Sequence, residues 1–341
     1  LAGAISHRNS FTVDGAGSVL DVAGVTSLAG TSVAVKSVNS VTFGSATSLT
    51  NVNLEASEGA QILFPTLTSY TGYSSADNTI QATGAGSRID LSHLETFYGG
   101  GEYDGGTYGG GWHYYTTYVK ALAAGEVDLA GEISHRNSIT VDGAGSVLGV
   151  AGITKLGGTA LTVNTPGTLT LGSVTEVTDS SLTASADVAL AFTAATTLKN
   201  VNLTATGGGD ILFPVATSYT GYNYGHTTIQ SSGAGSRIDL SHLETFYGGG
   251  EYDGGTYGGG WHYYTTYVKA LAAGEVDLAG AISHRNSFTV DGAGSVLDVA
   301  GVTSLAGTSV AVKSVNSVTF GSATSLTNVN LEASEGAQIL F

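Results

Sequence analysis

The sequence predicts an all-β protein, a parallel β-solenoid (β-helix) of about fourteen coils with 21 residues in a regular coil. Apolar anchor residues recur at a nearly constant pitch, each preceded two positions earlier by a second apolar residue, and glycine-rich breaks separate the short alternating runs. The spacing is 21 residues except at two consecutive steps of 27 and 38, which occur twice. The anchors are Val22, Phe43, Phe64, Leu91, Leu129, Val150, Leu171, Phe192, Phe213, Leu240, Leu278, Val299, Phe320 and Phe341.

One regular coil shows why strands form. Residues 11–14 alternate apolar and polar, the glycine-containing segment 15–18 predicts a turn, and residues 20–22 alternate again. Val25 and Leu28 supply a third apolar side, and Gly30 marks the next corner. Period-two alternation with β-branched residues favours strands, and no segment sustains a 3.6-residue period. Three short sides per coil predict a roughly triangular section, with a two-sided coil as the alternative.

Composition limits the function. The chain has 341 residues, 51 glycines, no cysteine and a formal net charge of −16. The negative charge argues against nucleic acid and anionic lipid as partners. Without cysteine, disulfides and thiolate metal sites are excluded. No stretch has the roughly 20 apolar residues of a membrane span.

Long internal repeats indicate a tandem array. Residues 1–64 are identical to residues 278–341, and residues 84–131 are identical to residues 233–280. We therefore expect residues 1–341 to form a single continuous solenoid, a window on a longer array with a super-repeat of 277 residues. Targeting signals are expected to lie outside this window.

Insertions break the regular coil at 71–78, 98–118, 220–226 and 247–267, about seven residues after an anchor. They are expected to leave the same corner of the solenoid. All 17 tyrosines and both tryptophans lie at or beside them, which predicts a specialised surface rather than core aromatics. The candidate partner-binding residues are Tyr73, Tyr98, Tyr103, Tyr108, Trp112, Tyr114, Tyr115, Tyr118, Tyr222, Tyr224, Tyr247, Tyr252, Tyr257, Trp261, Tyr263, Tyr264 and Tyr267.

Three roles fit these aromatic insertions. Tyrosine and tryptophan suit contacts with other copies of the array, and they equally suit stacking on the sugar rings of surface glycans. Alternatively, the insertions fold back and cover the flank of the solenoid. Their recurrence would make contact with any partner multivalent.

An acidic ladder is the second candidate site. The outward residue between paired apolar positions is aspartate at Asp239, Asp277 and Asp298, and at Asp90 and Asp128. Carboxylates stacked about 4.8 Å apart repel one another. Three interpretations stay open: solvated aspartates, neutralisation by Arg88 and Arg237, or a bound Ca²⁺ ion, which prefers oxygen ligands. No other cofactor is predicted.

The repeated Ser-His-Arg-Asn-Ser motif (residues 6–10, 134–138 and 283–287) contains catalytic residue types without a carboxylate at a defined position. It favours a polar corner whose side chains bond the backbone. A β-helix polysaccharide lyase or hydrolase needs one non-repeated cleft, whereas every candidate group here recurs in copies. We therefore expect no enzymatic activity.

The motifs Gly17-Ser18-Val19-Leu20-Asp21-Val22 and Ser87-Arg88-Ile89-Asp90-Leu91 resemble the β-helical repeats of large bacterial surface proteins, such as haemagglutinin-like adhesins and autotransporter passengers. The resemblance covers the whole chain and implies an extracellular or cell-surface setting. It implies a structural or adhesive filament whose rods self-associate through the aromatic insertions, with a glycan-binding adhesin as the alternative.

Overall fold

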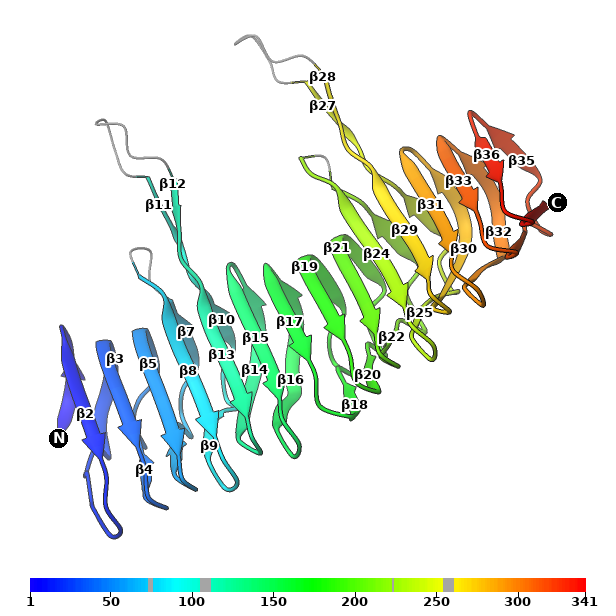
Figure 1. Cartoon of the computed structure of the whole chain (residues 1–341). Coiled ribbons are helices and arrows are strands. Elements are labelled where there is room, and N and C mark those ends of the chain that lie inside the picture. The colour runs from blue at the N-terminus through cyan, green and yellow to red at the C-terminus, as the bar shows by residue number, and fades with distance from the viewer. Residues whose placement is uncertain (73–75, 105–111, 223, 254–260) are drawn as a thin grey trace. The chain divides into compact units, whose positions relative to one another are not determined.

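The computed structural model is built of strands, with no helix among the residues it describes, which are 1–72, 76–104, 112–222, 224–253 and 261–341. The predicted fold class is confirmed: parallel strands stack in a β-solenoid of about 14 turns. The chain divides into two compact units, Leu1–Thr165 and Pro166–Phe341. Figure 1 shows the successive coils of each unit. A single solenoid that continues through the whole chain stays a prediction.

The strands of unit 1 follow one another around its coils. They are β1 (Ala2–Ile5), β2 (Asn9–Val13), β3 (Gly24–Val35), β4 (Ser40–Thr42), β5 (Ser48–Ser57), β6 (Gln61–Leu63), β7 (Ser69–Thr71), β8 (Asn78–Thr83), β9 (Arg88–Leu91), β10 (Thr96–Tyr98), β11 (Glu102–Asp104), β12 (Trp112–Tyr114), β13 (Thr117–Leu122), β14 (Glu126–Ser134), β15 (Asn137–Asp142), β16 (Val147–Gly157) and β17 (Thr159–Val163).

Unit 2 repeats the pattern. Its strands are β18 (Gly167–Thr170), β19 (Glu176–Ala184), β20 (Val188–Ala191), β21 (Thr197–Thr206), β22 (Asp210–Leu212), β23 (Ser218–Thr220), β24 (Thr227–Ser232), β25 (Arg237–Leu240), β26 (Thr245–Tyr247), β27 (Glu251–Asp253), β28 (Trp261–Tyr263), β29 (Thr266–Leu271), β30 (Glu275–Ser283), β31 (Asn286–Asp291), β32 (Val296–Ala306), β33 (Thr308–Val312), β34 (Ser317–Thr319), β35 (Ser325–Thr327), β36 (Asn330–Ala333) and β37 (Gln338–Leu340).

Parallel pairing in register stacks equivalent residues of successive coils. On one side of unit 1, Val33 of β3 pairs with Leu54 of β5, which pairs with Ile80 of β8, which pairs with Val119 of β13. All four side chains are at most 1% exposed. Since strand residues alternate between the two faces, one such column forms core and its neighbours face solvent.

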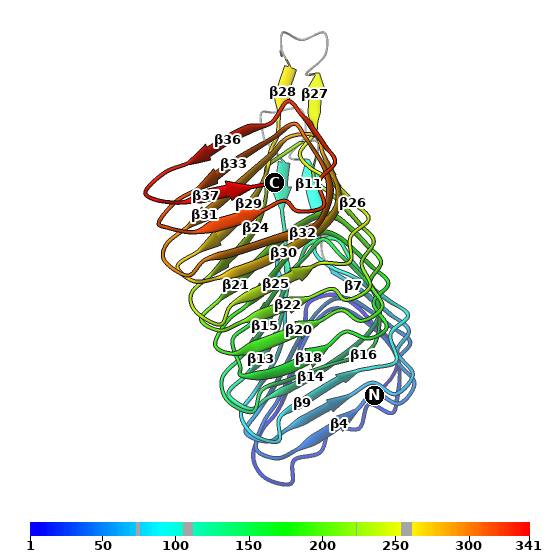
Figure 2. The same cartoon turned by 90° about the vertical axis from the view of Figure 1, so that its right-hand side faces the viewer.

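Each regular coil has three sides because its longest strand bends. β3 bends at Gly30 (φ +59°) and β5 bends at Asn51 (φ +52°), both in the left-handed region. In unit 2 the same bend uses Asn200 (φ +52°). Gly and Asn adopt this conformation at the least steric cost. We call this bend the left-handed corner. Figure 2, which views the chain at right angles to Figure 1, shows the corners stacked in each unit.

The anchor positions form the core. From Val22 to Phe320, every anchor is buried, with at most 7% of its surface exposed. Aromatic anchors stack between coils, as for Phe43 and Phe64 with ring centroids 4.8 Å apart. Phe341, in contrast, is 58% exposed.

One expectation about aromatics is wrong. Tyr70 and Tyr219 belong to the core, both 0% exposed, where they stack on Phe97 and Phe246. Each hydroxyl donates a hydrogen bond to a buried carbonyl, at 3.1 Å to Val52 O in unit 1 and at 3.0 Å in unit 2. This bond lets a polar aromatic serve in the core. Burial raises the pKa of Tyr219 to about 12, opposed by hydrogen bonds with Thr227 and Thr266.

Candidate functional site

In unit 1 the two insertions leave and rejoin the coils at the same place. They leave after the paired residues Thr71 and Tyr98, and they rejoin at the paired residues Asn78 and Thr117. In the regular coils this place is the left-handed corner. Unit 2 has the same arrangement, leaving after β23 and β26 and rejoining at β24 and β29. An insertion at a corner leaves the parallel pairing of the three sides intact.

The longer insertion of each unit is an antiparallel hairpin. In unit 1, β11 pairs with β12, with Glu102 opposite Tyr114 and Asp104 opposite Trp112. In unit 2, β27 pairs with β28 in the same register. Figure 1 shows both pairs extending away from the coils of their own units. The alternative in which these segments fold back over the flank is therefore wrong for the described strands.

Four side chains hold the base of each hairpin, and we call them the hairpin clamp. In unit 1 the Tyr98 ring stacks on the His135 ring, with centroids 3.4 Å apart, and the Arg136 guanidinium lies 3.9 Å from the centroid of Tyr114. Unit 2 repeats this geometry at 3.4 and 3.9 Å. Its clamp consists of Tyr247, Tyr263, His284 and Arg285.

Backbone bonds reinforce the clamp. Gly100 N donates to Arg136 O at 2.9 Å, and Tyr115 N donates to Gly101 O at 2.9 Å. Gly99 has to be glycine, because a β-carbon there would collide with Asn137 Oδ1. Asn137 Nδ2 in turn donates to Ser134 O at 2.8 Å. The hairpin is thus joined to the coil that follows it by both backbone and side chains.

The clamp gives the Ser-His-Arg-Asn-Ser motif a role that sequence reasoning missed. The expected bonding of side chains to backbone is confirmed for Asn137. His135 occupies the left-handed corner (φ +65°), so that it and Arg136 face the hairpin base. A signal was present, since the motif begins 16 residues after the long insertion in both complete copies. In the copy at residues 6–10, His7 and Arg8 are exposed, as are the corresponding residues of the two clamped copies.

Cations gather at the hairpin bases. Besides Arg136 and Arg285, the Nζ atoms of Lys120 and Lys269 lie 5.4 and 5.5 Å from the ring centroids of Tyr118 and Tyr267. Four of the 11 Lys and Arg residues thus contact hairpin-base tyrosines, and within the described ranges none of the four forms an ion pair. Burial lowers the pKa of His135, opposed by the charge of Glu102. The base of each hairpin thus combines cationic side chains with tyrosine rings.

The shorter insertion braces the hairpin differently in the two units. Asp77 Oδ1 accepts a hydrogen bond from Thr116 N at 2.8 Å in unit 1. In unit 2, His226 Nδ1 accepts from Thr265 N at 3.0 Å, and its ring lies 5.6 Å from Tyr264 and 5.4 Å from Tyr267.

The structure brings together part of the predicted aromatic set. Tyr222 contacts Tyr224 edge-to-face at 5.6 Å. Tyr115 is partly buried beside the clamp. Residues whose backbone lies on the hairpin strands, but whose side chains are not described, are Tyr103, Trp112, Tyr252 and Trp261. Residues outside the described ranges are Tyr73, Tyr108 and Tyr257.

Arginine contacts four of the five aspartates of the acidic ladder, whereas the fifth, Asp298, accepts a hydrogen bond from Ala300 N at 2.9 Å. Arg88 Nη2 lies 3.2 Å from Asp90 Oδ2 and 2.6 Å from Asp128 Oδ2, and its Nε lies 3.3 Å from Glu126. Arg237 makes the same three contacts in unit 2, with Asp239, Glu275 and Asp277. No three or more His, Asp or Glu residues are arranged to hold a metal ion in the part of the chain that the structure describes. Of the three interpretations of the acidic ladder, neutralisation by Arg88 and Arg237 is therefore the one that the contacts support.

Burial also shifts the pKa of one carboxyl in each cluster. It raises the pKa of Asp277 to about 6, opposed by its hydrogen bond with Arg237. In unit 1, burial raises the pKa of the neighbouring carboxyl, Glu126, with a further contribution from Asp128.

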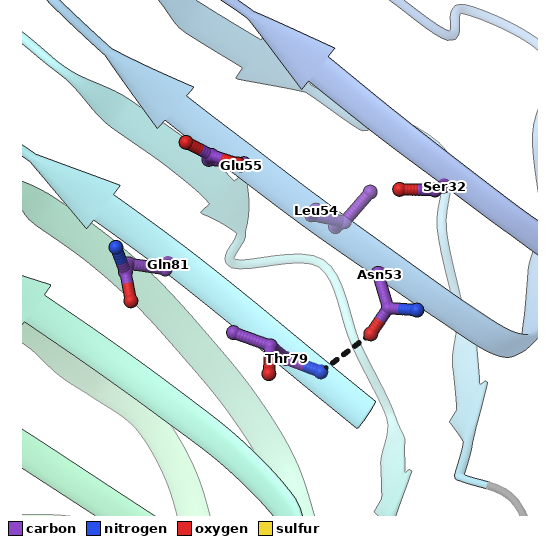
Figure 3. Close-up of a pocket in the computed structure, with 6 residues that line it drawn as sticks. All are labelled: Ser32, Asn53, Leu54, Glu55, Thr79 and Gln81. Atoms are coloured by element: carbon purple, nitrogen blue, oxygen red, sulfur yellow. Dashed lines mark hydrogen bonds between the residues drawn. The ribbon is translucent and has the colours of Figure 1, made fainter. Parts of the chain in front are cut away.

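A shallow polar groove lies on the outer face of unit 1. It has a volume of about 310 Å³ and is lined by Ser32, Asn53, Leu54, Glu55, Thr79 and Gln81 of β3, β5 and β8. Figure 3 shows Thr79 N donating to Asn53 Oδ1 across the strands, at 2.7 Å. Its only charged lining residue is Glu55, so the groove is acidic.

The fold and the clamp define a class: a β-solenoid repeat protein that displays aromatic hairpins from one corner of its coils. No protein-family model and no curated protein sequence matches the chain. Among solved structures, it is similar to the crystal structure of a TibC-catalysed hyper-glycosylated TibA fragment. The TM-score is 0.28 at 11% identity, covering 99% of this chain and 100% of that one. Among the described residues, no helix is long and apolar enough to cross a membrane.

Proposed function

We propose that this protein is a structural or adhesive filament of the bacterial cell surface, whose solenoid rods associate with copies of themselves through the aromatic hairpins. The observation that carries the proposal is the same clamp in both units, which presents a tyrosine-rich hairpin away from the coils. Holding a contact segment in place before binding reduces the entropy lost on association.

The distribution of exposed aromatics supports this role. The exposed tyrosines among the described side chains all lie at the insertions: Tyr98, Tyr114, Tyr224, Tyr247 and Tyr263 are 36% to 58% exposed. The phenylalanines of the anchor column, in contrast, are buried up to Phe320. Exposed tyrosine is typical of contact surfaces, because it offers a large apolar face with a polar end.

The rest of the proposal follows from the repeats. The two hairpins formed by described strands give multivalent contact, so weak individual contacts add up to stable association. The extracellular setting is supported by the resemblance of the repeats to bacterial surface proteins. We also propose that the role is not catalytic, since the groups gathered at the hairpin base recur in both units. Glycan binding through the same hairpins is the alternative function, and it would leave the purified chain monomeric.

The test is sedimentation velocity of the full chain over rising concentration, with negative-stain electron microscopy of the same samples. One variant replaces every Tyr and Trp of residues 98–118 with serine, and a second also replaces those of residues 247–267. We expect the wild type to associate, the first variant to associate more weakly, and the second to remain monomeric. Far-UV circular dichroism checks that each variant keeps its strands.

A matched control removes exposed apolar side chains elsewhere. Val19, Val38 and Val315 are 80% to 89% exposed at turns, and the triple serine variant should associate like the wild type. A wild type that stays monomeric at every concentration, or a double-hairpin variant that still associates, would refute the proposal.

A further inference from the structure

The two long insertions have the same sequence, but the short insertions beside them differ. Residues 98–118 recur unchanged as residues 247–267, whereas residues 74–77 read Ser-Ser-Ala-Asp and residues 223–226 read Asn-Tyr-Gly-His. The two hairpins can therefore differ in how they are held only through residues outside them. One such difference is the last residue of this stretch, which is Asp77 in unit 1 and His226 in unit 2.

These two side chains accept a hydrogen bond from equivalent backbone N–H groups. Thr116 N donates to Asp77 Oδ1 at 2.8 Å, and Thr265 N donates to His226 Nδ1 at 3.0 Å. Both threonines lie two residues after the second hairpin strand, β12 or β28. The bond therefore joins the short insertion to the base of the hairpin in each unit, through a carboxyl group in one and an imidazole in the other.

The two acceptors respond differently to acid. A carboxyl group keeps an oxygen that accepts a hydrogen bond in either protonation state. An imidazole accepts only through the nitrogen that carries no proton, so the bond from Thr265 N places the proton of the neutral His226 ring on Nε2. A second proton, added at Nδ1, makes this atom a donor that faces the Thr265 N–H, and the bond is lost. Histidine is the side chain that ordinarily gains its charge between pH 8 and pH 5.

The surroundings of His226 provide no substitute for this bond. Its ring lies 5.6 Å from the Tyr264 ring and 5.4 Å from the Tyr267 ring. Within the described ranges His226 forms no ion pair, and no other atom accepts from Thr265 N. The titratable groups on the elements around His226 are tyrosines and one cation, with no acid among them: Tyr222, Tyr224, Tyr264, Tyr267 and Lys269. A charged imidazole can stay beside the tyrosine rings, but they do not replace Nδ1 as the acceptor.

We propose that the hairpin of unit 2 is held by a pH-sensitive bond, made at neutral pH and released when His226 gains a proton, while the hairpin of unit 1 stays held. After release, the unit 2 hairpin keeps the backbone bond from Thr227 N to Thr265 O at 3.3 Å. Unit 1 has the same backbone bond, from Asn78 N to Thr116 O at 3.1 Å. Acid therefore loosens one of two identical hairpins without detaching it. This property goes beyond the proposed self-association and does not depend on it.

The test is electron paramagnetic resonance of a nitroxide attached to one hairpin of the full chain. Because the chain has no cysteine, His113→Cys allows only the unit 1 hairpin to be labelled, and His262→Cys only the unit 2 hairpin. Both positions are exposed and occupy equivalent places in their hairpins. From pH 8 to pH 5, loss of one hydrogen bond should raise the ratio of mobile to immobile signal about fivefold or more at position 262, and less than about twofold at position 113.

Exchange of the two acceptors separates this bond from other effects of acid. His226→Asp should make the unit 2 label insensitive to pH, and Asp77→His should give the unit 1 label the pH dependence of unit 2. The clamp histidines, His135 and His284, occur in both units, so their protonation should move both labels equally.

Four results would overturn the proposal: no change at position 262, equal changes at both labels, a pH dependence that survives His226→Asp, or no gain from Asp77→His. Each spectrum is repeated after tenfold dilution, and a response that disappears on dilution would also overturn it. The label reports the motion of one hairpin within a single chain. The result therefore does not depend on whether copies associate, and the two proposals fail independently.

Discussion

The guanidinium of Arg136 lies 3.9 Å from the centroid of the Tyr114 ring, joining the coil after the insertion to the second strand of the hairpin. The contact spans 22 residues of sequence and recurs between Arg285 and Tyr263. Together with the stacked rings of Tyr98 and His135, this contact makes the orientation of the hairpin depend on the following coil as well as on the insertion itself. Several consequences can be measured.

Arg136→Gln should loosen the unit 1 hairpin. An exposed cation–π contact contributes about 0.5–1 kcal/mol, so amide exchange in β11 and β12 should quicken about two- to fivefold. Hydrogen exchange with mass spectrometry measures this, with the unit 2 hairpin of the same molecule as reference. Arg8→Gln is the control, because no hairpin precedes Arg8 in this chain. Unchanged exchange in β11 and β12 would show that the backbone bonds hold the hairpin without arginine.

Gly99→Ala should disrupt the departure of the hairpin from the coil. The added methyl group meets Asn137 Oδ1 and the Arg136 carbonyl, and both residues are held by hydrogen bonds, Asn137 to Ser134 O and the Arg136 carbonyl to Gly100 N. Overpacking of this kind costs about 1–3 kcal/mol. Thermal unfolding followed by circular dichroism tests it. Gly44→Ala is the matched control, since the atom nearest to its added carbon is 3.9 Å away; a similar loss in both variants would contradict the explanation.

Phe64→Ala should destabilise the solenoid strongly. Phe64 is 0% exposed and stacks on Phe43 at 4.8 Å, so truncation leaves a cavity that costs about 3–5 kcal/mol. Phe341→Ala removes another phenylalanine of the anchor column, at a position where the side chain is 58% exposed. It should cost far less. Urea unfolding of the two variants measures the difference, and equal losses would argue against cavity formation.

Asp277 should make stability depend on pH. Its folded-state pKa of about 6 lies above the ordinary value of 3.8, so the folded state binds more protons between these values. Its contribution to stability is therefore fully present below about pH 4 and is lost as the pH rises through 6. Relative to Asp277→Asn, the wild type should lose at most about 3 kcal/mol over this range.

Urea unfolding at several pH values provides the measurement. Asp239→Asn is the control, because the pKa of Asp239 shifts in the opposite direction. Burial acts to raise this pKa, but hydrogen bonds from Ser241 and the charge of Arg237 lower it. The contribution of Asp239 is therefore present at neutral pH and lost as the pH falls. If the stability difference between Asp277→Asn and wild type does not change between pH 4 and 7, the raised pKa of Asp277 is refuted.

Much of the fold could be predicted from the sequence. The regular spacing of apolar residues predicts the anchor column, and its members from Val22 to Phe320 are buried. The common corner of the insertions also followed from spacing, as the pairing of Thr71 with Tyr98 shows. These features are local or periodic: alternation sets which side chains face inward, and the coil length sets which residues stack.

The candidate site was predicted only in part. The spacing located the aromatic insertions, but the grouping of all tyrosines with a surface role failed for Tyr70, whose hydroxyl finds a partner in Val52 O. Neutralisation by arginine was one of three interpretations of the acidic ladder, and Arg88 does contact its aspartates.

The sequence by itself thus determined the solenoid and the places where insertions leave it, since the order of residues specifies strand alternation and coil length. Only the tertiary structure decided that His135 and Arg136 clamp the hairpin and that burial raises the pKa of Asp277. The clamp and the pKa of Asp277 both depend on side chains from different coils lying close to one another. Their distances depend on backbone bends such as the left-handed corner at His135, which no repeat length specifies.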